Sequence, residues 1–413
     1  MNYIDKKFLL NESKRFCMIP FIHFNTFPDG KAYPCCISAV GVPVGNTNEQ
    51  SVDEVINSPI MKQMRIDILS EKPSEYCNAC YQHEETGISS FRQSANKEYG
   101  KYFESNVLES IQPDGSLSDF KMRYFDIRFS NICNFKCRTC GPDFSSQWEQ
   151  EFKINWPNKH RIIPDNRKPE LLEDLKKQIQ YMDTAYFAGG EPLITEEHYI
   201  LLEEMVRQGR NDIILRYNTN LSNLKFKDKD LLQLWKNFNK VYISASVDHY
   251  GKRAEYIRKG TDWDKVYDNI QKVRNLDYIE FGINTVVSAY NYYTMDDFYY
   301  FLINNNILTP NDITYSLYNM VGPKHQTAHI LPKKFKVEAR QKIEKLIEYM
   351  KQHGFRDNQV HQLKLMCDWV DTKDSWELHK NKFQNETEIL DNVRNESFVE
   401  TFPELAELMV RDE

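Results

Sequence analysis

Three cysteines stand close together in the segment "SNICNFKCRTCGPD", Ser130 to Asp143: Cys133, Cys137 and Cys140. Thiols at this spacing could form a disulfide, bind zinc or hold an iron–sulfur cluster. A structural zinc site normally takes four ligands, and no further Cys or close His follows in this segment. A cubane iron–sulfur cluster held by three thiolates keeps one iron open to a substrate or cofactor.

A second group of cysteines lies nearer the N-terminus and comprises Cys17, Cys35, Cys77 and Cys80. Cys77 and Cys80 form a CX2C pair, and Cys36 is a spare thiol that could replace Cys35. Four thiols can close a cubane cluster with no open iron, but CX2C pairs serve zinc equally well. The remaining cysteine, Cys367, is expected to be buried and inert.

Composition limits the class of protein. The chain has 413 residues, 41% of them hydrophobic and 27% charged, as in ordinary soluble proteins of two or three domains. A net charge of -7 argues against generic nucleic-acid binding. The sequence shows neither a secretory signal nor a long apolar run, so we expect a cytoplasmic protein that does not engage a membrane. Thiols stay reduced there, so nine cysteines indicate metal binding, catalysis or burial.

The elements that must position these thiols follow an alternating pattern from Arg123 onward. The expected strands are 124–130, 184–190, 212–220, 240–248, 279–288 and 312–319. The expected helices between them are 169–182, 196–209, 228–238, 263–276 and 295–306. Repeated βα units predict an α/β fold with a parallel sheet, and six units suggest a partial TIM-like barrel left open on one side.

The sequence pattern divides the chain into four predicted segments. Residues 1–104 form a small irregular unit with β-hairpins and a helix near 51–69, and residues 105–122 are a linker. The barrel occupies 123–320, and 321–413 is a mostly helical C-terminal cap.

Within the cap, 332–354 and 400–413 have helical patterns. His325 and His329 are expected at the surface, because Gly322 and Pro323 disfavour a helix around them.

Polar residues alternate with apolar ones along the expected strands, and side chains alternate faces along a strand. Because covering helices need apolar partners, the polar series should face the lumen of the barrel, where ordinary barrels place branched apolar residues. A polar lumen would hold a polar ligand, although a solvated sheet edge would give the same pattern. Asp126, Arg128 and Asp248 are candidates to touch a substrate there.

The segment "CNFKCRTC" resembles the radical S-adenosylmethionine (SAM) superfamily, whose CX3CX2C loop follows the first strand of a partial six-unit barrel. The resemblance implies that Cys133, Cys137 and Cys140 hold a catalytic [4Fe-4S] cluster. Thr139 stands where the family usually has an aromatic residue against adenine.

Other segments match the same family. "YFAGGEPL" resembles its GGEP element, which implies that Gly189, Gly190, Glu191 and Pro192 bind the methionine amino group. "YNTN", "SASVD" and "YIRKGTDW" fall where the family grips the ribose and carboxylate of SAM. The implied contacts there are Asn218, Ser246 and Arg258.

The N-terminal cysteines resemble the twitch domain, the shorter relative of the SPASM domain, which carries an auxiliary four-iron cluster. That resemblance implies a second [4Fe-4S] cluster on Cys17, Cys35, Cys77 and Cys80. These domains usually follow the barrel, whereas the match here precedes it. A zinc knuckle is the alternative.

Family resemblance implies an enzyme that reductively cleaves SAM to a 5′-deoxyadenosyl radical, which abstracts a hydrogen atom from substrate. By analogy the substrate is a peptide or protein side chain. The alternatives are a dehydrogenase or epimerase acting on an amino sugar or nucleoside, and a non-catalytic zinc-binding protein. A reductant such as flavodoxin or ferredoxin is the expected partner.

Overall fold

The computed structural model describes residues 5–38, 41–85, 89–159, 163, 169–312 and 315–411. The chain forms two compact units. The first unit comprises Met1–Asn131, Ile163–Arg216 and Gln233–Lys240, and the second comprises Ile132–Ile162, Tyr217–Leu232 and Val241–Glu413. Within the described ranges, no helix is both long enough and apolar enough to cross a bilayer.

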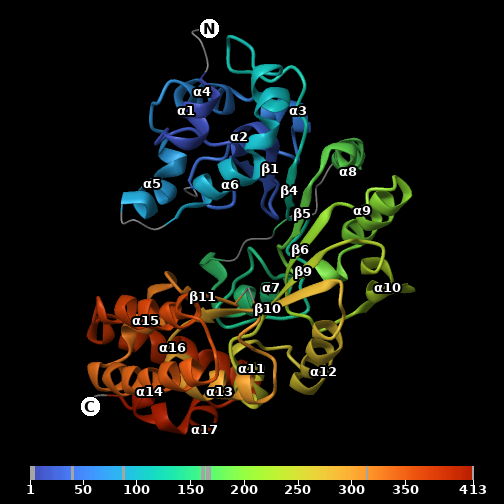
Figure 1. Cartoon of the computed structure of the whole chain (residues 1–413). Coiled ribbons are helices and arrows are strands. Elements are labelled where there is room, and N and C mark those ends of the chain that lie inside the picture. The colour runs from blue at the N-terminus through green and yellow to red at the C-terminus, as the bar shows by residue number, and fades with distance from the viewer. Residues whose placement is uncertain are drawn as a thin grey trace. The chain divides into compact units, whose positions relative to one another are not determined.

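Among the described residues, the first unit contains five complete strands in the order β3-β2-β1-β4-β5. They are β1 (His23–Thr26), β2 (Lys31–Tyr33), β3 (Gly45–Asn46), β4 (Tyr124–Ile127) and β5 (Thr184–Phe187). The pairing of β1 with β2 and of β2 with β3 is antiparallel. β4 is parallel to both β1 and β5, and these three strands are labelled in Figure 1. The N-terminal segment therefore adds β1 directly to the edge of the predicted barrel's first strand, with Asn25 opposite Asp126.

Helices surround this sheet in the first unit. They are α1 (Lys6–Asn11), α2 (Ile19–Ile22), α3 (Val52–Ile56), α4 (Pro59–Leu69), α5 (Asn78–Glu85), α6 (Phe91–Tyr99), α8 (Pro169–Gln178) and α9 (Glu196–Arg207). The helix expected near 51–69 is split, because the Ser58 side chain caps α4 and Pro59 occupies its first turn. Phe120 and Met122, in the segment expected to be a linker, are buried within this unit.

The second unit holds the parallel strands β9 (Val241–Ser246), β10 (Ile279–Val287) and β11 (Tyr315–Asn319). β6 (Ile214–Thr219) and α10 (Leu231–Trp235) pass from one unit to the other. A short hairpin pairs β7 (Lys225–Phe226) with β8 (Lys229–Asp230). All six expected strands are present, although residues 313–314 of the sixth lie outside the described ranges. The mostly parallel sheet and helical C-terminal region confirm the predicted fold class.

The predicted alternation is visible along β6 and β9. Leu215 and Tyr217 are buried on one face of β6, whereas Arg216 and Asn218 are half-buried on the other. The register places Ser246 of β9 opposite Asn284 of β10, so polar residues of neighbouring strands line up.

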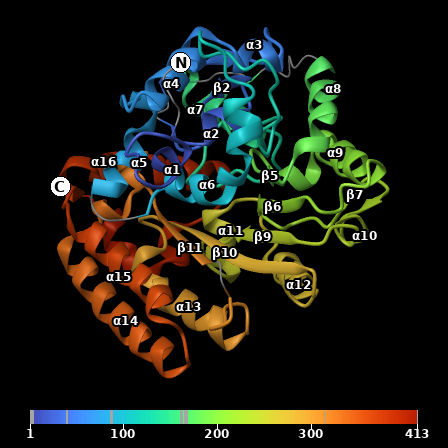
Figure 2. The same cartoon turned by 45° about the horizontal axis from the view of Figure 1, so that its top comes forward.

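The remaining helices of the second unit are α7 (Glu149–Asn155), α11 (Gly251–Ile257), α12 (Trp263–Arg274), α13 (Met295–Asn304), α14 (Lys333–Gln352), α15 (Asp357–Asp371), α16 (Trp376–Arg394) and α17 (Phe398–Thr401). α14 and α15 pack side by side (Figures 1 and 2). The helix expected over 400–413 is instead the end of α17 followed by a 3-10 turn, Pro403–Met409, because Pro403 cannot continue an α-helical ladder. Residues 412–413 lie outside the described ranges.

The expectation that His325 and His329 lie at the surface is wrong. Their exposed fractions are 3% and 8%. His329 hydrogen-bonds the carbonyl oxygen of Trp369 on α15, and His325 pairs with Glu386 on α16. Neither helix was anticipated, and their packing covers both imidazoles.

Candidate functional site

The three clustered cysteines lie together in a loop of the second unit. Cys133, Cys137 and Cys140 are all half-buried, and none of them forms a disulfide. The amide of Phe135 donates to Cys133 Sγ at 3.4 Å, and the amide of Cys140 donates to the Cys137 carbonyl at 3.0 Å. The backbone is thus folded so that the loop turns tightly between its second and third thiols.

Burial makes two of these thiols, Cys137 and Cys140, reluctant to ionise. It raises the pKa of Cys140 to about 12, with the neighbouring Cys137 thiol adding to the rise. It also raises the pKa of Cys137, while the Arg258 guanidinium acts in the opposite direction. A bound metal ion deprotonates the thiol that coordinates it. These thiols therefore suit a metal centre whose positive charge displaces their protons.

Arg258 connects the end of β9 to this loop. Its Nη1 lies 3.9 Å from Cys137 Sγ, and its Nε donates to Asp248 Oδ2 at 2.7 Å. Asp248 is fully buried, and its other oxygen accepts from the Val286 amide at 2.8 Å. These bonds tie Asp248 to Arg258 and to β10, and its contact with substrate stays a prediction. The grip of Arg258 on the SAM carboxylate stays a prediction.

Asn218 and Ser246 lie on the polar side of their strands. The Asn284 amide donates to Asn218 Oδ1 at 2.9 Å, and Asn284 also stands opposite Ser246 in the sheet register. Asn284 therefore neighbours both residues that the resemblance implies contact SAM.

The GGEP element lies in the first unit, after β5. Gly189 has φ of +128°, and a Cβ there would stand 3.1 Å from Cβ of Arg128. The Gly190 amide donates to the Ser130 carbonyl at 3.2 Å. Glu191 is buried, and its carboxylate accepts from the Leu193 amide at 3.1 Å, capping a 3-10 turn that begins at Pro192. Glycine freedom and close approach to the end of β4 thus fix this turn.

Asp126 and Arg128 form a buried pair on β4 and just beyond it. Arg128 Nε lies 3.7 Å from Asp126 Oδ1, and Asp126 is fully buried. Burial raises the pKa of Asp126 to about 6, against the opposing pull of the Arg128 charge. A role in touching substrate stays a prediction for both residues.

The four N-terminal thiols line one cavity of the first unit. Cys17, Cys35, Cys77 and Cys80 surround it together with apolar side chains that include Ile19, Met64 and Phe91. Burial raises the pKa of Cys35 well above its ordinary value and that of Cys77 to about 11. Neighbouring thiols raise both further. A buried, apolar cavity walled by thiols suits a thiolate-bound metal group.

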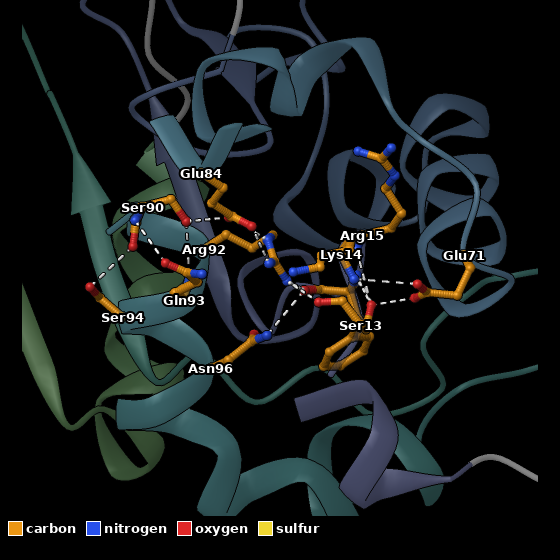
Figure 3. A network of polar contacts seen from close by, with 11 residues as sticks. Ser13, Lys14, Arg15, Glu71, Glu84, Ser90, Arg92, Gln93, Ser94 and Asn96 are labelled. Carbon is orange, nitrogen blue, oxygen red and sulfur yellow. Dashed lines mark hydrogen bonds and ion pairs between the residues drawn. The ribbon is translucent and has the colours of Figure 1, made fainter. Parts of the chain in front are cut away.

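Figure 3 shows a polar network in which Arg92 and Asn96 of α6 lie close to Ser13, near the N-terminal cysteines in the sequence. Arg92 Nη1 donates to the Phe16 carbonyl at 2.6 Å, and Asn96 Oδ1 accepts from the Met18 amide at 2.8 Å. Glu84 balances the charge of Arg92 at 2.6 Å. Sequence reasoning missed Arg92 and Asn96, although the capping box "SFRQ" at Ser90 marks the start of their helix.

Over the part of the chain that the structure describes, no three His, Cys, Asp or Glu side chains are gathered closely around the position of a single metal ion. Cys17, Cys35, Cys77 and Cys80 nevertheless line the same cavity.

Comparison with known families identifies both cysteine groups. Residues 127–301 match the Radical SAM superfamily, and residues 17–81 match the SPASM iron–sulfur cluster-binding domain. The chain belongs to the radical SAM superfamily. It is a radical SAM enzyme whose SPASM domain precedes the barrel, and such domains bind SAM and iron–sulfur clusters.

Curated relatives of this radical SAM enzyme are GTP 3′,8-cyclases. The protein from Campylobacter jejuni subsp. doylei (strain ATCC BAA-1458 / RM4099 / 269.97) is 28% identical over 170 residues, which are 41% of this chain and 48% of the relative. That from Clostridium botulinum (strain Okra / Type B1) is 24% identical over 192 residues, covering 43% and 52%. The chain thus spans about half the length of the curated relatives it matches.

Two solved structures are similar to it. Native anSMEcpe with bound AdoMet and Cp18Cys peptide is 17% identical, with a TM-score of 0.38 over 55% of this chain and 60% of that chain. SuiB of Streptococcus suis is 16% identical, with a TM-score of 0.38 over 71% and 62%.

Proposed function

We propose that this enzyme reductively cleaves SAM and abstracts a hydrogen atom from a peptide or protein side chain, with one [4Fe-4S] cluster at each cysteine group. The observation that carries the proposal is the arrangement of seven buried or half-buried thiols in two sets, each inside the matching family segment. When bound, the catalytic cluster supplies the electron that breaks a carbon–sulfur bond of SAM.

The chain's own residues have distinct proposed tasks. Cys133, Cys137 and Cys140 hold the catalytic cluster by three thiolates, which keeps one coordination position for SAM. The auxiliary cluster lies on Cys17, Cys35, Cys77 and Cys80. Cys35 is favoured over Cys36 because Cys35 lines the cavity, whereas Cys36 is not among the lining residues and lies near Asp126.

The proposed SAM contacts are of two kinds. Gly189 and Gly190 let backbone approach the methionine ammonium, and Glu191 complements its charge. Asn218, Ser246 and Arg258 are assigned to the ribose and carboxylate. In the second unit, Asn284 orients Asn218 through a hydrogen bond, and Asp248 orients Arg258 through an ion pair.

A peptide is favoured as substrate because the chain carries a SPASM domain, and auxiliary-cluster relatives often modify peptides. A nucleotide is the second candidate, favoured by the identity to GTP 3′,8-cyclases. A peptide and a nucleotide both carry polar groups, which the half-buried polar faces of β6, β9 and β10 could contact.

The test starts from anaerobic reconstitution with iron and sulfide. We expect about eight irons per chain, the content of two cubanes, and release of 5′-deoxyadenosine from SAM under dithionite. The triple substitution of Cys133, Cys137 and Cys140 by Ala should abolish that release, while Cys367→Ala, a buried thiol elsewhere, should preserve it. Zinc without iron would overturn the proposal.

The substrate class needs a separate experiment. Deuterated peptides from a proteolysed cell extract and deuterated nucleosides and nucleotides are supplied in parallel. Deuterium recovered in 5′-deoxyadenosine from the peptide arm alone supports the proposal. Transfer from the nucleotide arm alone selects the second candidate.

A further inference from the structure

Arg138 stands between two thiols of the cysteine loop and is almost completely buried, with an exposed fraction of 1%. Its Nη2 donates to Asp391 Oδ1 at 2.6 Å and to Glu396 Oε2 at 2.8 Å. The guanidinium also lies over the ring of Tyr256 at 3.7 Å. One side chain of the loop therefore bonds to both ends of a short C-terminal segment, residues 391–396.

The two carboxylates are held in place by further bonds. Asp391 also accepts from the Tyr256 hydroxyl at 2.7 Å and from the Phe398 amide at 2.7 Å. Glu396 pairs with Lys259 at 2.9 Å. Asn395 has φ of +51°, so the chain reverses after α16 and presents both carboxylates to one guanidinium. This is a preformed acidic fork and not a pair of solvated surface charges.

A second tie joins the same C-terminal segment to the loop. Arg394 Nη2 donates to Glu151 Oε2 at 2.8 Å, and Lys136 of the loop pairs with the other oxygen of that carboxylate. Arg394 also lies over the ring of Trp148 at 4.5 Å, and Trp148 Nε1 donates to the Cys137 carbonyl at 3.1 Å. Both ties end within one residue of a thiol.

We propose that residues 391–396 position the cysteine loop through Arg138, so that the C-terminal cap sets the geometry of the catalytic cluster. The inference rests on the proposed function, because it assigns that cluster to this loop. Arg138 and its two carboxylates are positioning residues, since the thiols themselves hold the cluster. Removing one partner of so buried a pair leaves a charge without compensation, and the loop would move to solvate it.

The test compares Asp391→Asn, Glu396→Gln and Arg138→Lys in the full chain. Amide hydrogen exchange of residues 133–140 is measured before iron is added, so this readout needs no cluster. We expect exchange to rise roughly tenfold or more in Glu396→Gln and Asp391→Asn, the effect of losing one charge-assisted bond. Arg138→Lys keeps the positive charge, so it should retain part of the wild-type protection of the loop against exchange.

Arg340→Gln is the matched control. Arg340, on α14, also bonds two carboxylates of the cap, Asp368 and Asp371 on α15. This variant should leave loop exchange unchanged. After reconstitution, the electron paramagnetic resonance spectrum of the reduced catalytic cluster, and its shift on adding SAM, should change in the fork variants and not in Arg340→Gln.

The outcomes separate this inference from the proposed function. Wild-type loop protection and an unchanged spectrum in both fork variants would overturn the positioning role. A wild-type protein that binds no cluster at the three cysteines would overturn the proposed function. Faster loop exchange in Asp391→Asn and Glu396→Gln would then show only that the C-terminal segment stabilises the loop.

Discussion

A Cβ atom on Gly260 would stand 2.8 Å from the carbonyl oxygen of Asn134, in the cysteine loop. The same atom would lie 3.0 Å from the Phe135 ring, and Gly260 itself has φ of +109°. Backbone bonds surround this contact, because the amides of Lys136 and Arg138 donate to the carbonyls of Lys259 and Ile257 at 2.8 Å. The loop that carries the thiols is therefore packed against a segment with no room for a side chain.

We predict that Gly260→Ala displaces the cysteine loop. The added methyl meets backbone, which cannot swing aside as a side-chain end can, and overpacking of this kind costs about 1–3 kcal/mol. Iron content should fall toward half, and SAM cleavage should fall with it.

The control for that prediction is Gly251→Ala. Gly251 has φ of +57°, so alanine is strained there too, but a Cβ meets nothing within 4 Å. A comparable loss of iron in both variants would show that backbone strain, and not contact with the loop, is responsible.

Arg92→Met should selectively weaken the N-terminal site. The substitution removes the donors to the Phe16 and Ser13 carbonyls and leaves Glu84 without its cation. Losing charge-assisted bonds in a buried setting costs about 1.5–3 kcal/mol each. Thermal unfolding of the apo-protein and the number of irons bound by the reconstituted protein are the measurements. Arg207→Met is the control, because Arg207 forms an exposed pair with Glu204.

Cys35→Ala and Cys36→Ala should differ although the residues are neighbours. Cys35 lines the cavity shared with Cys17, Cys77 and Cys80, while Cys36 is not among its lining residues and lies near Asp126. We expect Cys35→Ala to lose the auxiliary cluster and Cys36→Ala to retain it, as judged by iron content and the spectrum of the reduced protein. The reverse result would assign the ligand role to Cys36.

The sequence predicted what depends on local spacing. The two cysteine groups, the GGEP element and six strands could be found because each is written in a few consecutive residues. The bonds that hold the loops could not be found in that way. Arg138 meets Asp391 across 253 residues, and a lone Arg before a Cys gives no sign of its partner. The prediction that His325 is exposed failed for the same reason, because the residue that pairs with it, Glu386, lies on the distant helix α16.

The stability of the enzyme should fall below neutral pH, in part through His249. The Tyr250 amide donates to His249 Nδ1 at 2.9 Å, so the neutral ring carries its proton on Nε2, which faces Thr294 Oγ1 at 3.0 Å. Burial, with the nearby Arg253 charge, lowers the pKa of His249 to about 3. The unfolded chain then binds a proton near pH 6.5 that the folded one refuses, so stability is complete above about pH 6.5 and declines below it by up to about 1.4 kcal/mol per pH unit.

His249→Asn removes the titration and keeps an oxygen acceptor near the position of Nδ1. Urea unfolding midpoints of the wild-type protein and the variant, measured at pH 7.5 and at pH 5.5, provide the comparison. The wild-type midpoint should drop more between the two pH values. The difference can be assigned to His249, because His23 and His198, which burial also keeps neutral, are present in both proteins and titrate equally. Parallel losses in the two proteins would show that His249 does not contribute.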